Sequence, residues 1–129
     1  KPVYFYNWMG HELYAVESTA QLPTGPVTLK FTFDYDGGGL GKGGTAHLSV
    51  NGKPVAAGRI EKTVPFIFSM SGETFDVGED TGAPVGPYAH GFPFTGTIQK
   101  IEIELRDAPD AAAQQAVQQG QVNAALKAQ

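Results

Sequence analysis

The sequence contains no cysteine. This absence excludes disulfides, thiolate metal sites and cysteine nucleophiles within the chain. Long hydrophobic runs are missing too, and no run approaches the roughly 20 apolar residues that a membrane-spanning helix needs. Basic residues are few, since 9 Lys and Arg stand against 13 Asp and Glu, for a net charge of −4. With no basic stripe and no basic amphipathic face, neither nucleic acid nor a membrane surface is an expected partner.

Glycine and proline are abundant instead, with 17 Gly and 9 Pro among 129 residues. They lie between short apolar runs rather than in one tract, a distribution typical of many turns and therefore of many strands. A chain of this length fits a single domain with its own core. It begins at Lys1 directly on strand-like sequence, and we expect it to be a fragment of a longer protein.

The clearest strand pattern covers residues 27–36, where apolar and polar side chains alternate over ten positions. Period-two alternation places one face on a core and the other in water. Asn51-Gly52 separates two further strand patterns, and Asn-Gly at such a position indicates a hairpin with a type I′ turn. Pro54 follows the turn, which is typical of an edge strand. Further strands are expected at residues 3–8, 11–17, 45–50, 53–60, 66–70, 74–77 and 94–105.

The last 22 residues differ from the rest because Ala and Gln dominate them. Their propensity favours helix, with Asp107 or Asp110 as the cap and an interruption at Gly120. The apolar stripe is thin, so we expect helix only where the tail docks and fraying otherwise. The pattern as a whole predicts an all-β domain over residues 1–107, an antiparallel sandwich of jelly-roll type, followed by a helical or frayed tail at 108–129.

Two loops carry residues of chemical interest. The glycine run at 37–44 lacks the Ser or Thr after Lys42 and the following helix that a phosphate-binding loop requires, so a positive-φ connection is the better interpretation. Asp76, Glu79 and Asp80 are weak calcium candidates, because oxygen-rich loops near glycine hold that ion. Such side chains also satisfy backbone N–H groups in turns, and this structural interpretation is preferred.

Candidate catalytic residues form no recognisable set. His11, His47 and His90 are too far apart in sequence for a ligand pair, and no Gly-x-Ser-x-Gly elbow is present. A glycosidase needs two opposed carboxylates, which the sequence alone does not place. Exposed aromatic residues can stack on sugars, and the candidate binding residues are Trp8, Tyr14, Tyr88 and His90. Packing in a core or between domains is the competing interpretation for such residues.

Five stretches together resemble one family. They are residues 28–39, 41–46, 48–55, 59–65 and 74–85, the last reading Thr-Phe-Asp-Val-Gly-Glu-Asp-Thr-Gly-Ala-Pro-Val, with Phe94-Thr95-Gly96-Thr97-Ile98 after it. In this order they resemble the C-terminal domain of long bacterial arylsulfatases, members of the alkaline-phosphatase-like superfamily. The resemblance covers residues 10 to 110.

The resemblance implies a β-sandwich attached to a sulfatase catalytic domain in the same polypeptide. It also implies that the parent enzyme hydrolyses sulfate esters with a formylglycine, made within a Cys/Ser-x-Pro-x-Arg motif, and a calcium ion. Neither Cys nor Ser-x-Pro-x-Arg occurs in this chain, so no catalytic residue and no cofactor is assigned to it. The expected function is that of a non-catalytic accessory domain, with a lectin-like carbohydrate-binding module as the alternative.

Overall fold

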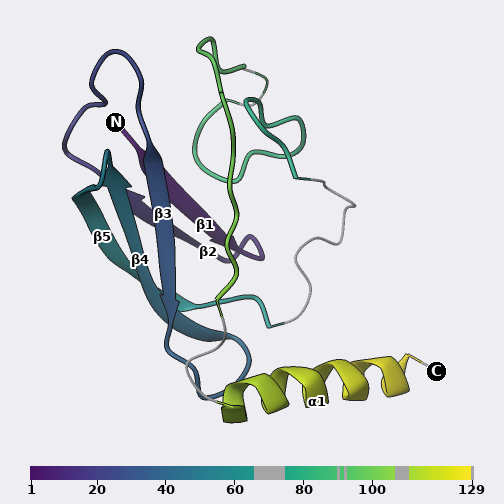
Figure 1. Ribbon diagram of the computed structural model, residues 1–129. Coiled ribbons are helices and arrows are strands. Elements are labelled where there is room, and N and C mark those ends of the chain that lie inside the picture. Colours follow the sequence, from purple (N-terminus) through teal and green to yellow (C-terminus); the bar gives the residue numbers. More distant parts are fainter. Residues whose placement is uncertain (66–74, 90, 92, 107–110, 129) are drawn as a thin grey trace.

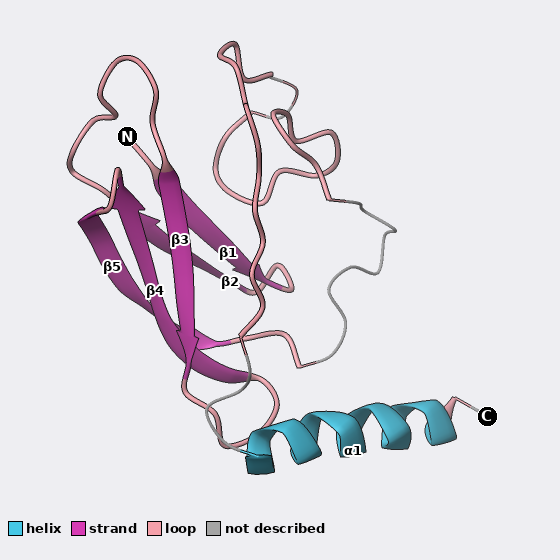
Figure 2. Ribbon diagram, in the orientation of Figure 1, coloured by secondary structure: helices cyan, strands magenta, loops and turns pink. Residues whose placement is uncertain are grey.

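The computed structural model describes residues 1–65, 75–89, 91, 93–106 and 111–128. Five strands and one helix follow one another along the chain: β1 (Val3–Trp8), β2 (Glu12–Glu17), β3 (Leu29–Tyr35), β4 (Lys42–Val50), β5 (Lys53–Lys62) and α1 (Ala111–Lys127). The strands form two antiparallel sheets, β1-β2 and β3-β4-β5. Figure 2 shows the two-stranded sheet behind the three-stranded one, with the helix below both. The predicted β-rich class is confirmed.

The hairpin β1-β2 turns at Met9-Gly10, both of which have positive φ. The Asn7 side chain caps this turn by accepting a hydrogen bond from the Gly10 N–H at 2.8 Å. Paired residues alternate between two faces: Tyr6 lies opposite Tyr14 on one face, and Phe5 lies opposite Ala15 on the other. The hairpin therefore presents a different set of side chains to each side.

The predicted Asn51-Gly52 hairpin joins β4 to β5, and both residues have positive φ, at 50° and 79°. The pairing shifts between Leu48 and Ser49, where β5 carries one extra residue. Because β5 is the outer strand of the order β3-β4-β5, Pro54 lies in an edge strand, as the sequence predicts.

The core lies where the hairpin packs against β4 and β5. Its buried members are Val16, Ala46, Leu48 and Ile60. Val16 of β2 faces Gly58 of β5 so closely that a Cβ on Gly58 would come within 2.8 Å of the Val16 Cγ2. Tyr4 extends the contact by stacking on Phe31 of β3, with ring centroids 4.1 Å apart.

Two glycines lie inside β4, which begins earlier than the sequence predicts. A Cβ on Gly43 would approach the Ile60 carbonyl oxygen at 2.3 Å, and one on Gly44 would approach the Phe33 ring at 2.5 Å. These positions need glycine for space. By contrast Gly37, Gly38, Gly39 and Gly41 have positive φ, which confirms the interpretation of that loop as a positive-φ connection.

Two predicted strands are not present. Residues 75–77 and 94–105 belong to segments 75–89 and 93–106, which carry no strand pairing in the part of the chain that is described. Their alternation is strand-like, but pairing depends on a neighbour that sequence does not reveal. The predicted strand at 66–70 and its turn at 71–72 lie outside the described residues.

The tail forms α1, and the helix continues through Gly120, so the predicted interruption there is wrong. A Cβ at Gly120 would meet the Leu40 Cδ1 at 2.4 Å. The helix therefore contacts the glycine loop through Leu40, at the one place where it lacks a side chain. The expected caps Asp107 and Asp110 lie outside the described residues. No helix within the described ranges is long and apolar enough to span a membrane.

Replacing Gly58 tests the packing of the two sheets. We expect Gly58→Ala to lower the free energy of unfolding by about 1–3 kcal/mol, because the added methyl group collides with Val16. Urea denaturation measures this loss. Ala57→Ser, on the exposed face next to it, is the matched control and should stay within about 0.5 kcal/mol of the unchanged protein. Adding Val16→Ala to Gly58→Ala should cost less than the sum of the two single changes; strict additivity would contradict the contact.

Candidate functional site

Trp8 and Tyr14, two of the predicted binding residues, lie together on the inward face of the hairpin. The Lys62 Nζ lies 4.5 Å from the Trp8 ring centroid, a cation–π contact. The Trp8 ring is half-buried, and its Nε1 is a buried atom without a hydrogen-bond partner among the described residues. Lys62 thus covers one face of the ring, leaving less of it free for a sugar to stack on.

Glu12 connects this pair of aromatic residues to Lys62. Its carboxylate accepts a hydrogen bond from the Tyr14 hydroxyl and forms an ion pair with the Lys62 Nζ at 3.0 Å. The hydrogen bond from Tyr14 contributes most to lowering the pKa of Glu12, and the contact with Lys62 lowers it further. The same hydrogen bond raises the pKa of Tyr14 to about 12. Glu12 thus pairs with both of its neighbours, as the acceptor for the Tyr14 hydroxyl and as the anion for Lys62.

Tyr88 lies on the opposite side of the hairpin. Its ring is 6.0 Å from that of Phe5, and its hydroxyl donates to Asp80 at 2.7 Å. The Asn7 side chain also contacts the loop that contains Tyr88, by donating a hydrogen bond to the Val85 carbonyl at 3.3 Å. His90 lies outside the described residues. The structure therefore does not bring Trp8, Tyr14 and Tyr88 into one binding platform.

The calcium candidates are occupied by contacts within their own loop. Asp76 accepts hydrogen bonds from the Thr81 N–H at 3.0 Å and the Thr81 hydroxyl at 2.7 Å. Both hydrogen bonds lower the pKa of Asp76, and the one from the Thr81 backbone contributes more than the one from the hydroxyl. Asp80 is bound by Tyr88, and Glu79 is exposed. Within the described residues, no three potential ligands converge near this loop, and the calcium assignment stays a prediction.

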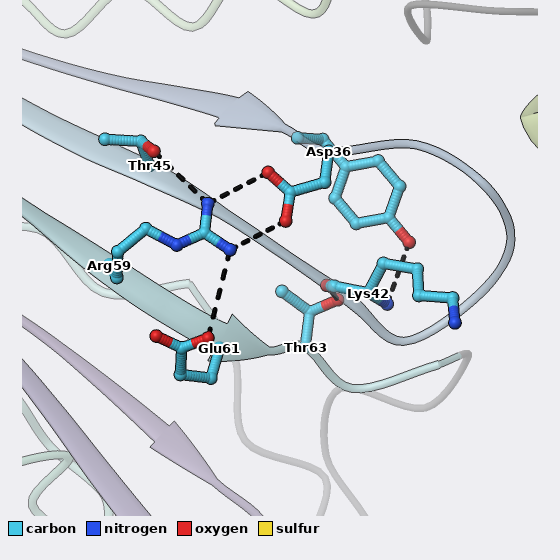
Figure 3. Close-up of polar contacts among 7 residues, drawn as sticks. Asp36, Lys42, Thr45, Arg59, Glu61 and Thr63 are labelled. Carbon is cyan, nitrogen blue, oxygen red and sulfur yellow. Dashed lines mark hydrogen bonds and ion pairs between the residues drawn. The ribbon is translucent and has the colours of Figure 1, made fainter.

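A charged face covers the side of β3-β4-β5 that points away from the hairpin. Arg59 forms a bidentate ion pair with Asp36, through bonds of 2.9 and 2.7 Å, and also donates to the Thr45 hydroxyl at 3.3 Å. Figure 3 shows the guanidinium between Asp36, Thr45 and Glu61. The Arg59 contact lowers the pKa of Asp36, and Asp36 raises that of Arg59. Sequence reasoning did not connect these residues, because their register was unknown.

Asp34 continues the charged face. Its Oδ2 lies 3.2 Å from the His47 Nε2, and its Oδ1 accepts a hydrogen bond from Arg106 at 3.1 Å. Both aspartates of residues 27–36 are therefore paired with arginines that lie far away in sequence. A general acid or base needs a free group within reach of a substrate, and these carboxylates are engaged in ion pairs on an open surface.

Four exposed apolar residues, Phe75, Val77, Phe94 and Ile98, lie on two segments that meet at Gly78. The backbone joins the two segments that carry them, since the Phe94 N–H donates to the Gly78 carbonyl at 2.6 Å. The Ile98 Cδ1 lies 3.5 Å from where a Cβ on Gly78 would be. Exposed fractions run from 45% for Ile98 to 72% for Phe75. We call these four residues the loop patch; the sequence indicated only strand faces here.

Comparisons with known proteins add no assignment: no protein-family model matches the sequence, and neither curated proteins nor solved structures show a significant match to it.

The Glu12–Tyr14 hydrogen bond has a pH window that can be measured. Because the pKa of Glu12 is lowered from its ordinary value of 4.5, the ionised carboxylate stabilises the fold above pH 4.5. This contribution is lost as the pH falls through the lowered pKa. The raised pKa of Tyr14 stabilises it below 10.0, and this contribution is lost as the pH rises toward about 12. We expect NMR titration of Tyr14 to report a pKa near 12 that falls toward 10 in Glu12→Gln. The Tyr88 titration serves as the control and should not change.

Proposed function

We propose that this chain is a non-catalytic accessory domain that packs, through the loop patch, on the catalytic domain of an arylsulfatase-like enzyme in the same polypeptide. The loop patch carries the proposal: two Phe, one Val and one Ile that are 45–72% exposed. Adjacent large apolar residues left in water mark a surface made for a partner. Interfaces between domains of one chain bury surfaces of this kind.

The identity of the partner rests on the sequence. Both sides of the loop patch belong to the stretches that resemble the arylsulfatase C-terminal domain, at 74–85 and at 94–98. Hydrogen bonds of Asp76 with Thr81 and of Asp80 with Tyr88 hold the loop that carries Phe75 and Val77. A loop held in this way presents apolar side chains in a fixed arrangement, which lowers the entropic cost of docking.

The absence of catalysis in this chain is part of the same proposal. The carboxylates Asp34, Asp36 and Glu12 are each held by a cation. The formylglycine and calcium that the resemblance implies would belong to the catalytic domain. The finer architecture, a sandwich in which the antiparallel sheets β1-β2 and β3-β4-β5 pack face to face, is also proposed; the packing of β2 on β5 at Val16 and Gly58 supports it.

Binding in trans tests the docking. The coding region upstream of Lys1 should encode a Cys/Ser-x-Pro-x-Arg motif, and the polypeptide that carries it is expressed separately. Isothermal titration with this chain should give saturable binding that Phe94→Ser weakens at least tenfold, about 1.4 kcal/mol. Leu126→Ser, an equally exposed apolar residue on α1, is the matched control and should leave the affinity unchanged. Equal weakening by both variants, or no binding, would contradict the proposal.

Activity and glycan assays on the isolated chain separate the other functions. We expect no turnover of a chromogenic aryl sulfate, since the chain contains no Cys/Ser-x-Pro-x-Arg motif. We also expect flat calorimetry against a panel of sulfated and neutral glycans, because Lys62 covers one face of the Trp8 ring. Saturable glycan binding that Trp8→Ala abolishes would replace the docking proposal with a carbohydrate-binding module. Turnover of the aryl sulfate would contradict the non-catalytic assignment.

A further inference from the structure

The edge of β3 that faces away from β4 has no strand beside it in the described part of the chain. The Asp36 N–H donates to Gly43 and the Asn51 N–H donates to Thr28, so even-numbered residues of this strand bond to β4. By alternation, the backbone groups of Leu29, Phe31 and Phe33 point toward the free edge. Leu29 and Phe31 are also exposed, at 52% and 41%. An open apolar edge of this kind is a surface for adding a strand.

Residues 101–106 are extended and equally unpaired. Ile101, Ile103 and Leu105 are 50%, 69% and 92% exposed. No backbone hydrogen bond is formed by these residues within the described chain. Figure 1 shows the segment, in green, running in the same direction as β3. Arg106 already holds its end to the strand, through the 3.1 Å contact with Asp34.

The two sequences match when Arg106 is placed opposite Asp34 in a parallel register. Leu105, Ile103 and Ile101 then fall beside Phe33, Phe31 and Leu29 on the face that carries the core. On the charged face, Glu102 falls beside Lys30. The segment then contributes the cation to one pair, Arg106 with Asp34, and the anion to the other, Glu102 with Lys30. Apolar residues fall beside apolar residues at three positions and opposite charges beside each other at two, while Glu104 falls beside Thr32.

We propose that the free edge of β3 is an interaction surface for the chain's own residues 101–106, which close on it as a parallel strand. In this register the Phe31 N–H donates to the Glu102 carbonyl, and the Glu104 N–H donates to the Phe31 carbonyl. Closure adds a strand to β3-β4-β5 and covers both apolar rows. It also fixes the segment that carries Phe94 and Ile98, so the sheet and the loop patch become one rigid unit. The inference does not depend on the identity of the docking partner.

Residue-level amide exchange on the full chain tests the closure. The amides of Glu102, Glu104 and Arg106 should exchange at least about tenfold more slowly than those of Ile101, Ile103 and Leu105, because only the first set points at β3. The Phe31 and Phe33 amides should be slowed as well. Equal exchange of both sets would overturn the proposal. Protection of Phe31 that grows with protein concentration would assign the edge to a second copy instead, and would overturn it too.

A charge exchange tests the register. Lys30→Glu places a negative charge beside Glu102. The Glu104 amide should then exchange about tenfold faster than in the unchanged chain. The double variant Lys30→Glu with Glu102→Lys should restore it. Lys53→Glu, at the start of β5, is the matched control and should change nothing. Slow exchange of the Ile60 amide shows that each variant is folded. Failure of the double variant to restore protection would contradict the register even if the segment is closed.

Discussion

The contact between Val16 and Gly58 is the constraint on which the structure depends. The hairpin β1-β2 is not sufficient alone, since an isolated two-stranded hairpin is marginally stable in water. Gly58 lets β2 approach β5 closely, and Val16 fills the space beside Ala46, Leu48 and Ile60. Because this core is small, the aromatic residues around it, such as Tyr4 on Phe31, provide much of the remaining buried area.

The contact also separates the two faces of the domain. With one face of β3-β4-β5 committed to the hairpin, the opposite face is left to water and carries the ion pairs of Arg59 and Asp34. The outward face of the hairpin is contacted by the loop that contains Tyr88, at Phe5 and Asn7. The loop patch and the row at 101–105 are among the apolar surfaces that remain exposed. The proposed docking and the proposed strand closure each give one of these apolar surfaces a partner.

Local signals in the sequence predicted part of this structure well. The alternation at 27–36 and the Asn51-Gly52 turn depend on neighbouring residues alone, and both are found as expected, within two residues at each end. The strand predicted at 94–105, which alternates regularly only after a slip between Ile98 and Ile101, has no ladder in the described chain. Pairing requires a neighbouring strand that tertiary structure supplies. Trp8 and Tyr14 were identified by residue type, but not the Lys62 that covers Trp8, since sequence does not show which distant cation comes near. The arginine partners of Asp34 and Asp36 were missed for the same reason.

The single tryptophan offers a direct test of whether hairpin and sheet form one unit. Trp8 belongs to the hairpin, and its ring contacts Lys62 of β5, so its fluorescence should report on this contact. Far-UV circular dichroism reports on the backbone of the strands and of α1 together. Urea unfolding should be followed by both signals on the same sample. If the two sheets are held together as described, the transitions coincide in midpoint and slope. A fluorescence transition at clearly lower urea would show that the hairpin detaches first, and would contradict a core shared by both sheets.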